Sequence, residues 1–224
     1  MDDAVSGRPL RPGGNEWLRS GAGTAGGATS LVDTVAVLPP RQQIYLVAVA
    51  VYVALLHSIV LGAGRRVVMS ELRAMAADLG FRNPQTLVAT GNLVFEGDNP
   101  SIPDIENMLE TAFSASFGKS VDIIVREAGA WRRLATNNPF ADGIGSDVVV
   151  RVMRTPLDPS VLDMLSDRRS GSERIAIVGG DLWVNFGGKP SLSRLLSVLT
   201  TKRLGVGTLR NWNTVRGLDQ MLGP

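Results

Sequence analysis

The sequence predicts an α+β protein made of two ferredoxin-like lobes packed together. Two observations support this fold class. From about Val49 onward, the apolar periodicity changes in the order strand, helix, strand, strand, helix, strand, and this order occurs twice. The central strands of each unit are separated by a glycine-containing hairpin turn, Gly91-Asn92 in the first unit and Gly179-Gly180 in the second. The order βαββαβ is that of the ferredoxin-like fold. It repeats in topology and not in residue identity.

The first strand is predicted in the second half of the apolar run Ile44 to Gly62. Valine, isoleucine and tyrosine favour a β pleat, and His57 and Ser58 interrupt the run. The alternative is a membrane span, because about 20 mainly apolar residues can cross a bilayer. We favour the strand, and we therefore expect no membrane partner. No basic segment of the kind found in secretory signals precedes the run, so we also expect a cytoplasmic location.

The remaining elements of the first lobe, residues 44–140, follow in order. A helix with apolar residues from Met69 to Leu79 ends at Gly80, and a helix opened by Pro103 ends at Gly118. The other strands are predicted at 85–89, 93–96 and 121–125, and a linking helix at 128–135 leads to the turn Asn138-Pro139-Phe140.

The second lobe, residues 141–224, is predicted from the same kinds of pattern. Strands are expected at 148–153, 175–178, 182–186 and 208–211, and helices at 159–165 and 192–203. A terminal helix capped by Asn213 is expected to reach about Leu222. Residues 1–43 are rich in Gly, Ser, Arg and Pro and have little periodic apolar content, so we expect a disordered tail.

The composition excludes several kinds of chemistry. The chain has no cysteine and one histidine, His57, which rules out thiolate nucleophiles and zinc-thiolate or multi-histidine metal sites. No cofactor and no metal site are expected. The acidic residues Glu71, Asp122, Asp181 and Asp219 show no spacing that pairs two of them in one site, and we expect them to be solvated charges. No catalytic residue is assigned, and whether the protein is an enzyme stays open.

Several strings of the chain carry a resemblance to a known family. YVALL, VVMSELRAM, TGNLVF, NNPF and LSRLLSVLTTKRLGVGTLRNWNTV occur in this order between about Val51 and Leu222. Together they resemble the bacterial family of domain of unknown function 1697. The resemblance implies a soluble protein with two ferredoxin-like lobes and no established activity. In the first loop, His57 to Ala63, this chain departs from the family pattern, because an arginine and an asparagine found there in family members are absent.

Candidate ligand-binding residues lie in three short segments. Arg210, Asn211, Trp212 and Asn213 place a guanidinium, two amides and an indole just before a helix. Ser193 and Arg194 open another predicted helix, and Thr90 and Asn92 stand at the first hairpin. The alternative interpretation of each is structural: a helix cap, an indole packed between the lobes, and a turn.

Two functions remain open. The first is binding of a small anionic molecule, a nucleotide or a phosphorylated metabolite, between the lobes by Arg210, Asn211, Asn213 and Arg194. The second is a single-stranded RNA-binding module, which an exposed sheet face bearing Trp183 and Phe186 would favour. The net charge of only +2 does not indicate indiscriminate nucleic-acid binding, although a local basic patch would permit it. The sequence does not predict the oligomeric state.

Overall fold

The computed structural model describes residues 49–62, 64–98 and 101–223, which belong to one compact unit. The predicted tail, residues 1–43, and the first residues of the apolar run lie outside the described residues. The described residues combine helices with antiparallel sheets, as the sequence predicts.

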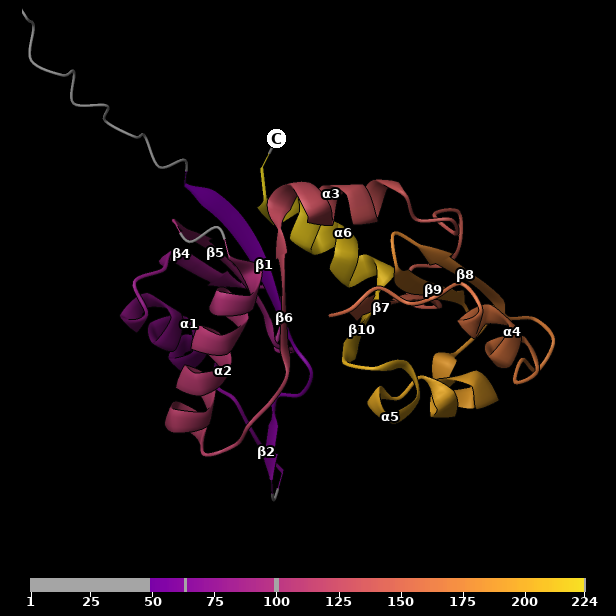
Figure 1. Ribbon diagram of the computed structural model, residues 1–224, viewed down its shortest axis with the longest axis horizontal. Helices are drawn as coiled ribbons and strands as arrows, with labels where there is room; N and C mark the ends of the chain where they lie inside the picture. Colours follow the sequence, from indigo (N-terminus) through magenta and orange to yellow (C-terminus); the bar gives the residue numbers. More distant parts are fainter. Residues whose placement is uncertain (1–48, 63, 99–100, 224) are drawn as a thin grey trace, which may run out of the picture. The chain divides into compact units, whose positions relative to one another are not determined.

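The first lobe is a four-stranded antiparallel sheet with the strand order β4-β5-β1-β6 and two helices on one face (Figure 1). This is the order expected when the chain runs strand, helix, strand, strand, helix, strand. Its elements are β1 (Ala50–Leu56), α1 (Met69–Asp78), β4 (Arg82–Thr86), β5 (Asn92–Gly97), α2 (Ile102–Phe117) and β6 (Ile123–Glu127). A small hairpin of β2 (Val60–Gly62) and β3 (Arg65–Arg66), which the sequence analysis interpreted as a loop, precedes α1.

Strand β1 explains the long apolar run, because both of its faces are buried. Tyr52, Ala54 and Leu56 pack in the core beneath α1 and α2. Val53 and Leu55, which point to the opposite face, pack in a second core. A strand covered on both sides reads as continuous apolar sequence, which is why it resembles a membrane span. In the part of the chain that the structure describes, no helix has both the length and the apolar character needed to cross a bilayer.

The second lobe has the sheet order β10-β7-β9-β8, again antiparallel. Its elements are β7 (Val148–Met153), α4 (Val161–Ser166), β8 (Arg174–Val178), β9 (Asp181–Asn185), the 3₁₀ helices η1 (Pro190–Leu192) and η2 (Arg194–Val198), α5 (Thr201–Leu204) and β10 (Gly207–Asn211). A third core lies between this sheet and α4, η2 and α5, with Leu165, Leu195 and Leu204 among its buried residues.

The single helix predicted over 192–203 is wrong, because the segment is divided into η1, η2 and α5. Ser193 and Thr200 have extended backbone conformations that interrupt the helical path. The Ser193 side chain accepts a hydrogen bond from the backbone N–H of Leu195, 3.1 Å away. Serine and threonine side chains of this kind compete with helical hydrogen bonds, and the segment 192–203 contains four of them.

Helices α3 (Ala128–Thr136) and α6 (Trp212–Met221) pack together in the core that joins the two sheets. Val53, Leu55 and Val94 of the first sheet, and Val148, Val150 and Trp183 of the second, belong to this core. The Trp131 indole N–H of α3 donates to the Val215 carbonyl of α6 at 3.3 Å. Trp212 meets Trp183 edge to face, with 6.0 Å between ring centroids. The two lobes therefore share one apolar layer.

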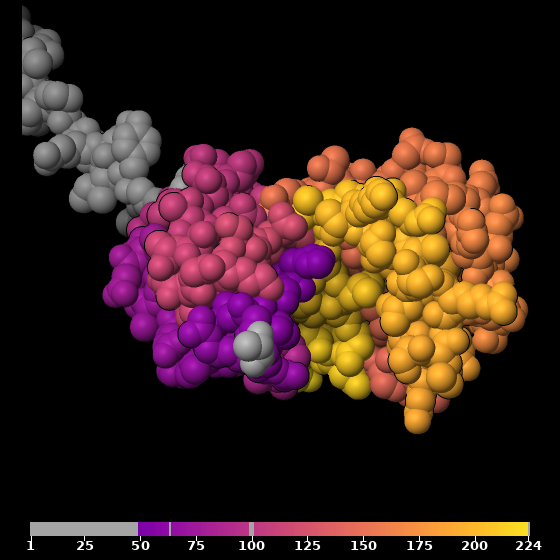
Figure 2. Space-filling view, turned by 90° about the horizontal axis from the view of Figure 1, so that it is seen from below, coloured from indigo at the N-terminus to yellow at the C-terminus, as the bar shows by residue number. Residues whose placement is uncertain are grey.

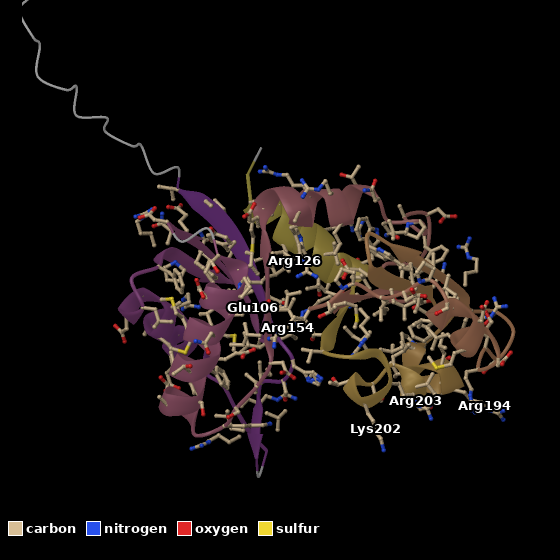
Figure 3. The ribbon with its side chains drawn as sticks, in the orientation of Figure 1. Glu106, Arg126, Arg154, Arg194, Lys202 and Arg203 are labelled. Atoms are coloured by element: carbon tan, nitrogen blue, oxygen red, sulfur yellow. The ribbon has the colours of Figure 1, made fainter. Side chains whose placement is uncertain are left out.

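Ion pairs also connect the lobes, beside this shared layer. Arg154, which follows β7, pairs with Glu106 of α2 at 3.2 Å and with Glu110 one helical turn later (Figure 3). Arg126 of β6 lies 3.6 Å from Asp181 of β9.

The expectation that Asp181 is a solvated charge is wrong, because the residue is only 7% exposed. Its carboxylate accepts a hydrogen bond from the Met153 backbone N–H at 2.7 Å. Burial raises the pKa of Asp181, and the Met153 hydrogen bond and Arg126 oppose that rise only in part. Burial likewise raises the pKa of Glu106.

Candidate functional site

Arg210 lies on the edge strand β10 and reaches across to the first lobe. Its Nε donates to Asn92 Oδ1 at 2.5 Å, and its Nη2 donates to the carbonyls of Leu56 and Gly91 at 2.9 and 3.2 Å. Nη1 donates to the Thr208 hydroxyl and to the Leu209 carbonyl. These five bonds use all five guanidinium N–H groups. Arg210 therefore connects the two lobes through side-chain hydrogen bonds.

The hairpin residues Thr90 and Asn92 belong to the same hydrogen-bond network. The Asn92 amide donates to Thr90 Oγ1 at 2.7 Å and to the Leu87 carbonyl at 3.1 Å, so its oxygen is oriented toward Arg210. Gly91 has φ +74, and a Cβ at this position would lie 2.6 Å from Ile59 and 2.9 Å from Leu56. The turn needs glycine both for its backbone conformation and for its close packing. The structure thus brings Arg210, Thr90 and Asn92 together.

The three residues after Arg210 begin helix α6. Asn211, and not Asn213, is the N-cap: its side-chain oxygen accepts from the Thr214 backbone N–H at 2.9 Å. Trp212 is buried in the core shared by the lobes. Asn213 is exposed and accepts a hydrogen bond from Arg216 at 2.7 Å. The side-chain oxygens of Asn211 and Asn213 are thus both engaged within α6.

Ser193 and Arg194 lie apart from the Arg210 network, on the outer side of the second lobe. The Ser193 hydroxyl donates to Glu173 Oε1 at 2.5 Å, and this bond lowers the pKa of Glu173. Arg194 lines a hollow together with Arg168 and Arg169. The predicted combination of Arg194 with Arg210 is therefore not formed in this structure.

A pocket of about 560 Å³ opens beside Arg210 at the junction of the lobes. We call it the Arg210 pocket. Its walls are formed by β10, β7, α5 with the residues just before it, and the residue that follows β1. The lining residues are His57, Arg151, Leu199, Thr200, Thr201, Lys202, Gly207, Thr208, Leu209 and Arg210. Among these described residues there is no aspartate or glutamate, so the lining charge is positive.

Arg151 is the second buried cation of this pocket and is only 2% exposed. Its Nη1 donates to the Leu199 carbonyl at 2.9 Å, and its Nη2 donates to the Gly205 carbonyl at 3.0 Å. Its Nε is buried and has no hydrogen-bond partner. A Cβ on Gly207 would lie 2.9 Å from this nitrogen, so glycine at 207 makes room for the guanidinium. The hydrogen bonds that Arg151 and Arg210 donate to described residues all go to uncharged oxygens.

Both arginines therefore carry buried positive charge without a carboxylate partner. Burial lowers the pKa of Arg210 to about 10 and also lowers that of Arg151. The Arg210 side chain therefore remains protonated at neutral pH. A buried, unpaired charge is unfavourable unless an opposite charge approaches it. The pocket therefore has the electrostatic character of an anion site.

Three residues of the pocket lining were not predicted from the sequence as site residues: Arg151, Thr201 and Lys202. Arg151 could have been noticed, because it stands alone in the apolar strand VVVRVM, where a charge is expected to be buried. Thr201 and Lys202 gave no such signal, since both fell within a predicted continuous helix.

The exposed aromatic face that would favour RNA is not found among the described residues. Trp183 is 0% and Phe186 is 3% exposed, and the other described aromatic side chains are buried too. The described residues also contain no group of three histidine, cysteine or acidic side chains that could hold a metal ion.

Comparisons with known proteins give a family and a fold. The family model described as "Protein of unknown function (DUF1697)" matches residues 49–183. A solved structure, described as conserved bacterial protein SP0830 from Streptococcus pneumoniae, is 23% identical to this chain, with a TM-score of 0.62. The similarity covers 78% of this chain and 99% of that one, and at this identity it shows the fold alone. A search of the curated proteins finds no match.

Proposed function

Because the chain belongs to the DUF1697 family, whose description assigns no activity, we propose a function from the site itself: binding of a small phosphate-bearing anion, a nucleotide or phosphorylated metabolite, in the Arg210 pocket. The observation that carries this proposal is the pair of buried arginines, Arg151 and Arg210, beside a pocket that no described carboxylate lines.

Both arginines contribute to this proposal mainly through their charge. All N–H groups of Arg210 are already used, so it contributes positive potential and rigidity and makes no direct contact of its own. The same holds largely for Arg151. Because both guanidinium groups are buried, water screens their charges less than it would at the surface, so they attract an anion even without contact. The potential of the pocket is thus set by the fold before any ligand arrives.

Direct contacts come from the more accessible residues of the lining. Lys202 is exposed and has no ion pair with any described residue, so its ammonium is free to reach an anion. The hydroxyls of Thr200 and Thr201 supply donors beside it. The volume of about 560 Å³ lies within the range of small-molecule sites, which spans about 300 to 1,000 Å³. A nucleotide-sized ligand fits this volume.

Thermal unfolding with added pyrophosphate, adenosine monophosphate or adenosine tests the proposal. A ligand at about 100 times its Kd adds about 2.7 kcal/mol, which raises the midpoint by about 5–11 °C for a chain of this length. We expect pyrophosphate and adenosine monophosphate to raise it and adenosine to have no effect. The proposal is wrong if neither anion stabilises the protein, or if adenosine stabilises it as much as its monophosphate.

Two lysine variants locate the binding site. Lys202→Ala removes a charged contact and is expected to weaken anion binding about tenfold, which corresponds to about 1.4 kcal/mol. Lys189→Ala removes an equal charge from an exposed position outside the pocket lining and is expected to leave the affinity unchanged. Equal weakening in both variants would show that the overall charge, and not the pocket, attracts the anion.

A further inference from the structure

A band of arginines lies on the outer side of the second lobe, separate from the lining of the Arg210 pocket. It consists of Arg168 and Arg169, which follow α4, Arg194 of η2, and Arg203 of α5, and we call it the arginine band. All four side chains are exposed. Figure 3 shows Arg194 and Arg203 on the side of the lobe formed by η2 and α5. Figure 2 looks toward that side, where the orange-yellow segment forms much of the surface.

The guanidinium groups of this band are largely unpaired. Arg169 donates one hydrogen bond to the Glu173 carbonyl at 3.3 Å. Arg168, Arg194 and Arg203 make no side-chain hydrogen bond or ion pair with any residue in the described ranges. Elsewhere in the same chain exposed arginines do find carboxylates, as Arg82 does with Asp98 at 2.6 Å. The free charges of the band are therefore available to a partner.

The band lines two adjoining hollows. Arg168, Arg169 and Arg194 surround one of about 280 Å³, and Arg168 and Arg203 line the next, of about 190 Å³. Asp167 borders both hollows and is the single carboxylate among their described lining residues. Arg168 lines both hollows, so the positive charge is continuous from one to the other. A partner that carries a series of anionic groups could contact both hollows at once.

The grouping of three arginines at one hollow favours phosphate over carboxylate. A carboxylate is planar and is usually held by one guanidinium fork in its own plane. The oxygens of a phosphate are arranged tetrahedrally, so guanidinium groups can approach it from several directions. Two adjoining hollows lined by arginine are complementary in charge to a run of phosphates along a nucleic-acid backbone.

The burial of the described aromatic side chains distinguishes between forms of nucleic acid. Proteins that hold single strands stack the bases on exposed aromatic rings. Every described tryptophan, tyrosine and phenylalanine of this chain is buried, so such rings are not offered here. A duplex has its bases already stacked, and its phosphates can be contacted by a positive surface that does not reach the base edges. We propose that the arginine band binds the phosphate backbone of a nucleic-acid duplex without reading its sequence.

Fluorescence anisotropy with a short labelled DNA duplex of random sequence tests this proposal on the full chain. Affinity is measured between about 50 and 200 mM salt, where each neutralised phosphate contributes about −0.9 to the slope of log K against log salt. Four arginines then set a slope of about −3 to −4. A single strand of the same length and a polyglutamate peptide are measured in parallel, and both are expected to bind more weakly than the duplex.

Matched charge reversals separate the band from the overall charge of the chain. Arg168→Glu combined with Arg194→Glu is expected to weaken duplex binding more than tenfold and to reduce the magnitude of the salt slope by about 2. Arg65→Glu combined with Arg66→Glu changes the net charge equally at two exposed residues of β3 and is expected to change the affinity less than twofold. Circular dichroism melting checks that both variants fold, and unchanged binding of adenosine monophosphate checks the Arg210 pocket.

Three outcomes would overturn the proposal. The first is absence of duplex binding at the lowest salt. The second is an equal loss in the two double variants, which would mean that binding follows net charge. The third is tighter binding of polyglutamate than of duplex, which would identify an acidic protein segment as the partner of the band.

Discussion

Replacing Arg210 with methionine tests whether this residue connects the lobes. Methionine keeps an apolar stem of similar length and removes the guanidinium. Three hydrogen bonds to the first lobe disappear, those to Asn92 and to the carbonyls of Leu56 and Gly91. The acceptors that remain are buried and cannot be reached easily by water, so the loss is not regained by hydration.

The expected cost is about 3 kcal/mol, at about 1 kcal/mol net for each bond between the lobes. The two hydrogen bonds within β10, to Thr208 and Leu209, are not counted in this cost. Their loss is offset because methionine removes the unfavourable free energy of keeping a charge buried. For a chain of 224 residues, a loss of 3 kcal/mol lowers the unfolding midpoint by about 6–12 °C.

Thermal and urea unfolding followed by circular dichroism measure this loss. Arg216→Met is the matched control, because Arg216 is an exposed arginine of α6 that bonds only to Asn213 and lies over the Trp212 ring at 5.6 Å. We expect it to cost less than about 1 kcal/mol. If Arg210→Met were as stable as Arg216→Met, the buried network would not stabilise the contact between the lobes, and the reasoning would be refuted.

Two further predictions concern Asp181 and Gly91. Because burial raises the pKa of Asp181, this carboxyl group holds a proton more tightly in the folded protein than in the unfolded chain. The stability that the protonated group contributes is full below the ordinary aspartate pKa and is lost as pH rises through the raised value. The unfolding free energy of the native chain relative to Asp181→Asn should therefore increase from pH 7 to pH 4. Asp98→Asn should show the opposite trend, since hydrogen bonding with Arg82 lowers the pKa of Asp98. A constant difference for Asp181→Asn would contradict the raised pKa. Gly91→Ala should cost about 2–4 kcal/mol, because the new methyl group overlaps Ile59 and Leu56 at positive φ, whereas Gly64→Ala, with φ +78 and nothing within 4 Å, should cost about 1 kcal/mol. If urea titrations gave the same loss of unfolding free energy for both variants, overlap with Ile59 and Leu56 would not destabilise Gly91→Ala.

The fold was accessible from the sequence because its strands and helices have strong local signals. Strand β7 was predicted with its observed limits, since five apolar residues surround one arginine there. Helix α2 has both a proline near its start and a glycine at its C-cap. The segment 192–203 was misjudged because leucines at helical spacing outweighed the serines and threonines that break it.

The candidate site was less accessible, because it depends on contacts between distant residues. Arg210 was identified from its neighbours in the sequence, but its partner Asn92 lies 118 residues away. No local pattern tells whether a guanidinium is free to bind a ligand or is already saturated by the protein. Arg151 and Lys202 meet only when β7 and α5 pack together, and this is a property of the tertiary fold.

The position of α6 has a consequence for how the chain is made. This helix, residues 212–221, is synthesised after both sheets, yet it covers inner-face residues of each of them. Until it leaves the ribosome, Val53, Leu55 and Val94 of the first sheet lack part of their cover, although every strand of that sheet has already been made. The nascent first sheet therefore carries an incomplete apolar surface from the addition of Glu127 until α6 emerges, and a ribosome stalled before Trp212 would hold a chain that is prone to aggregate.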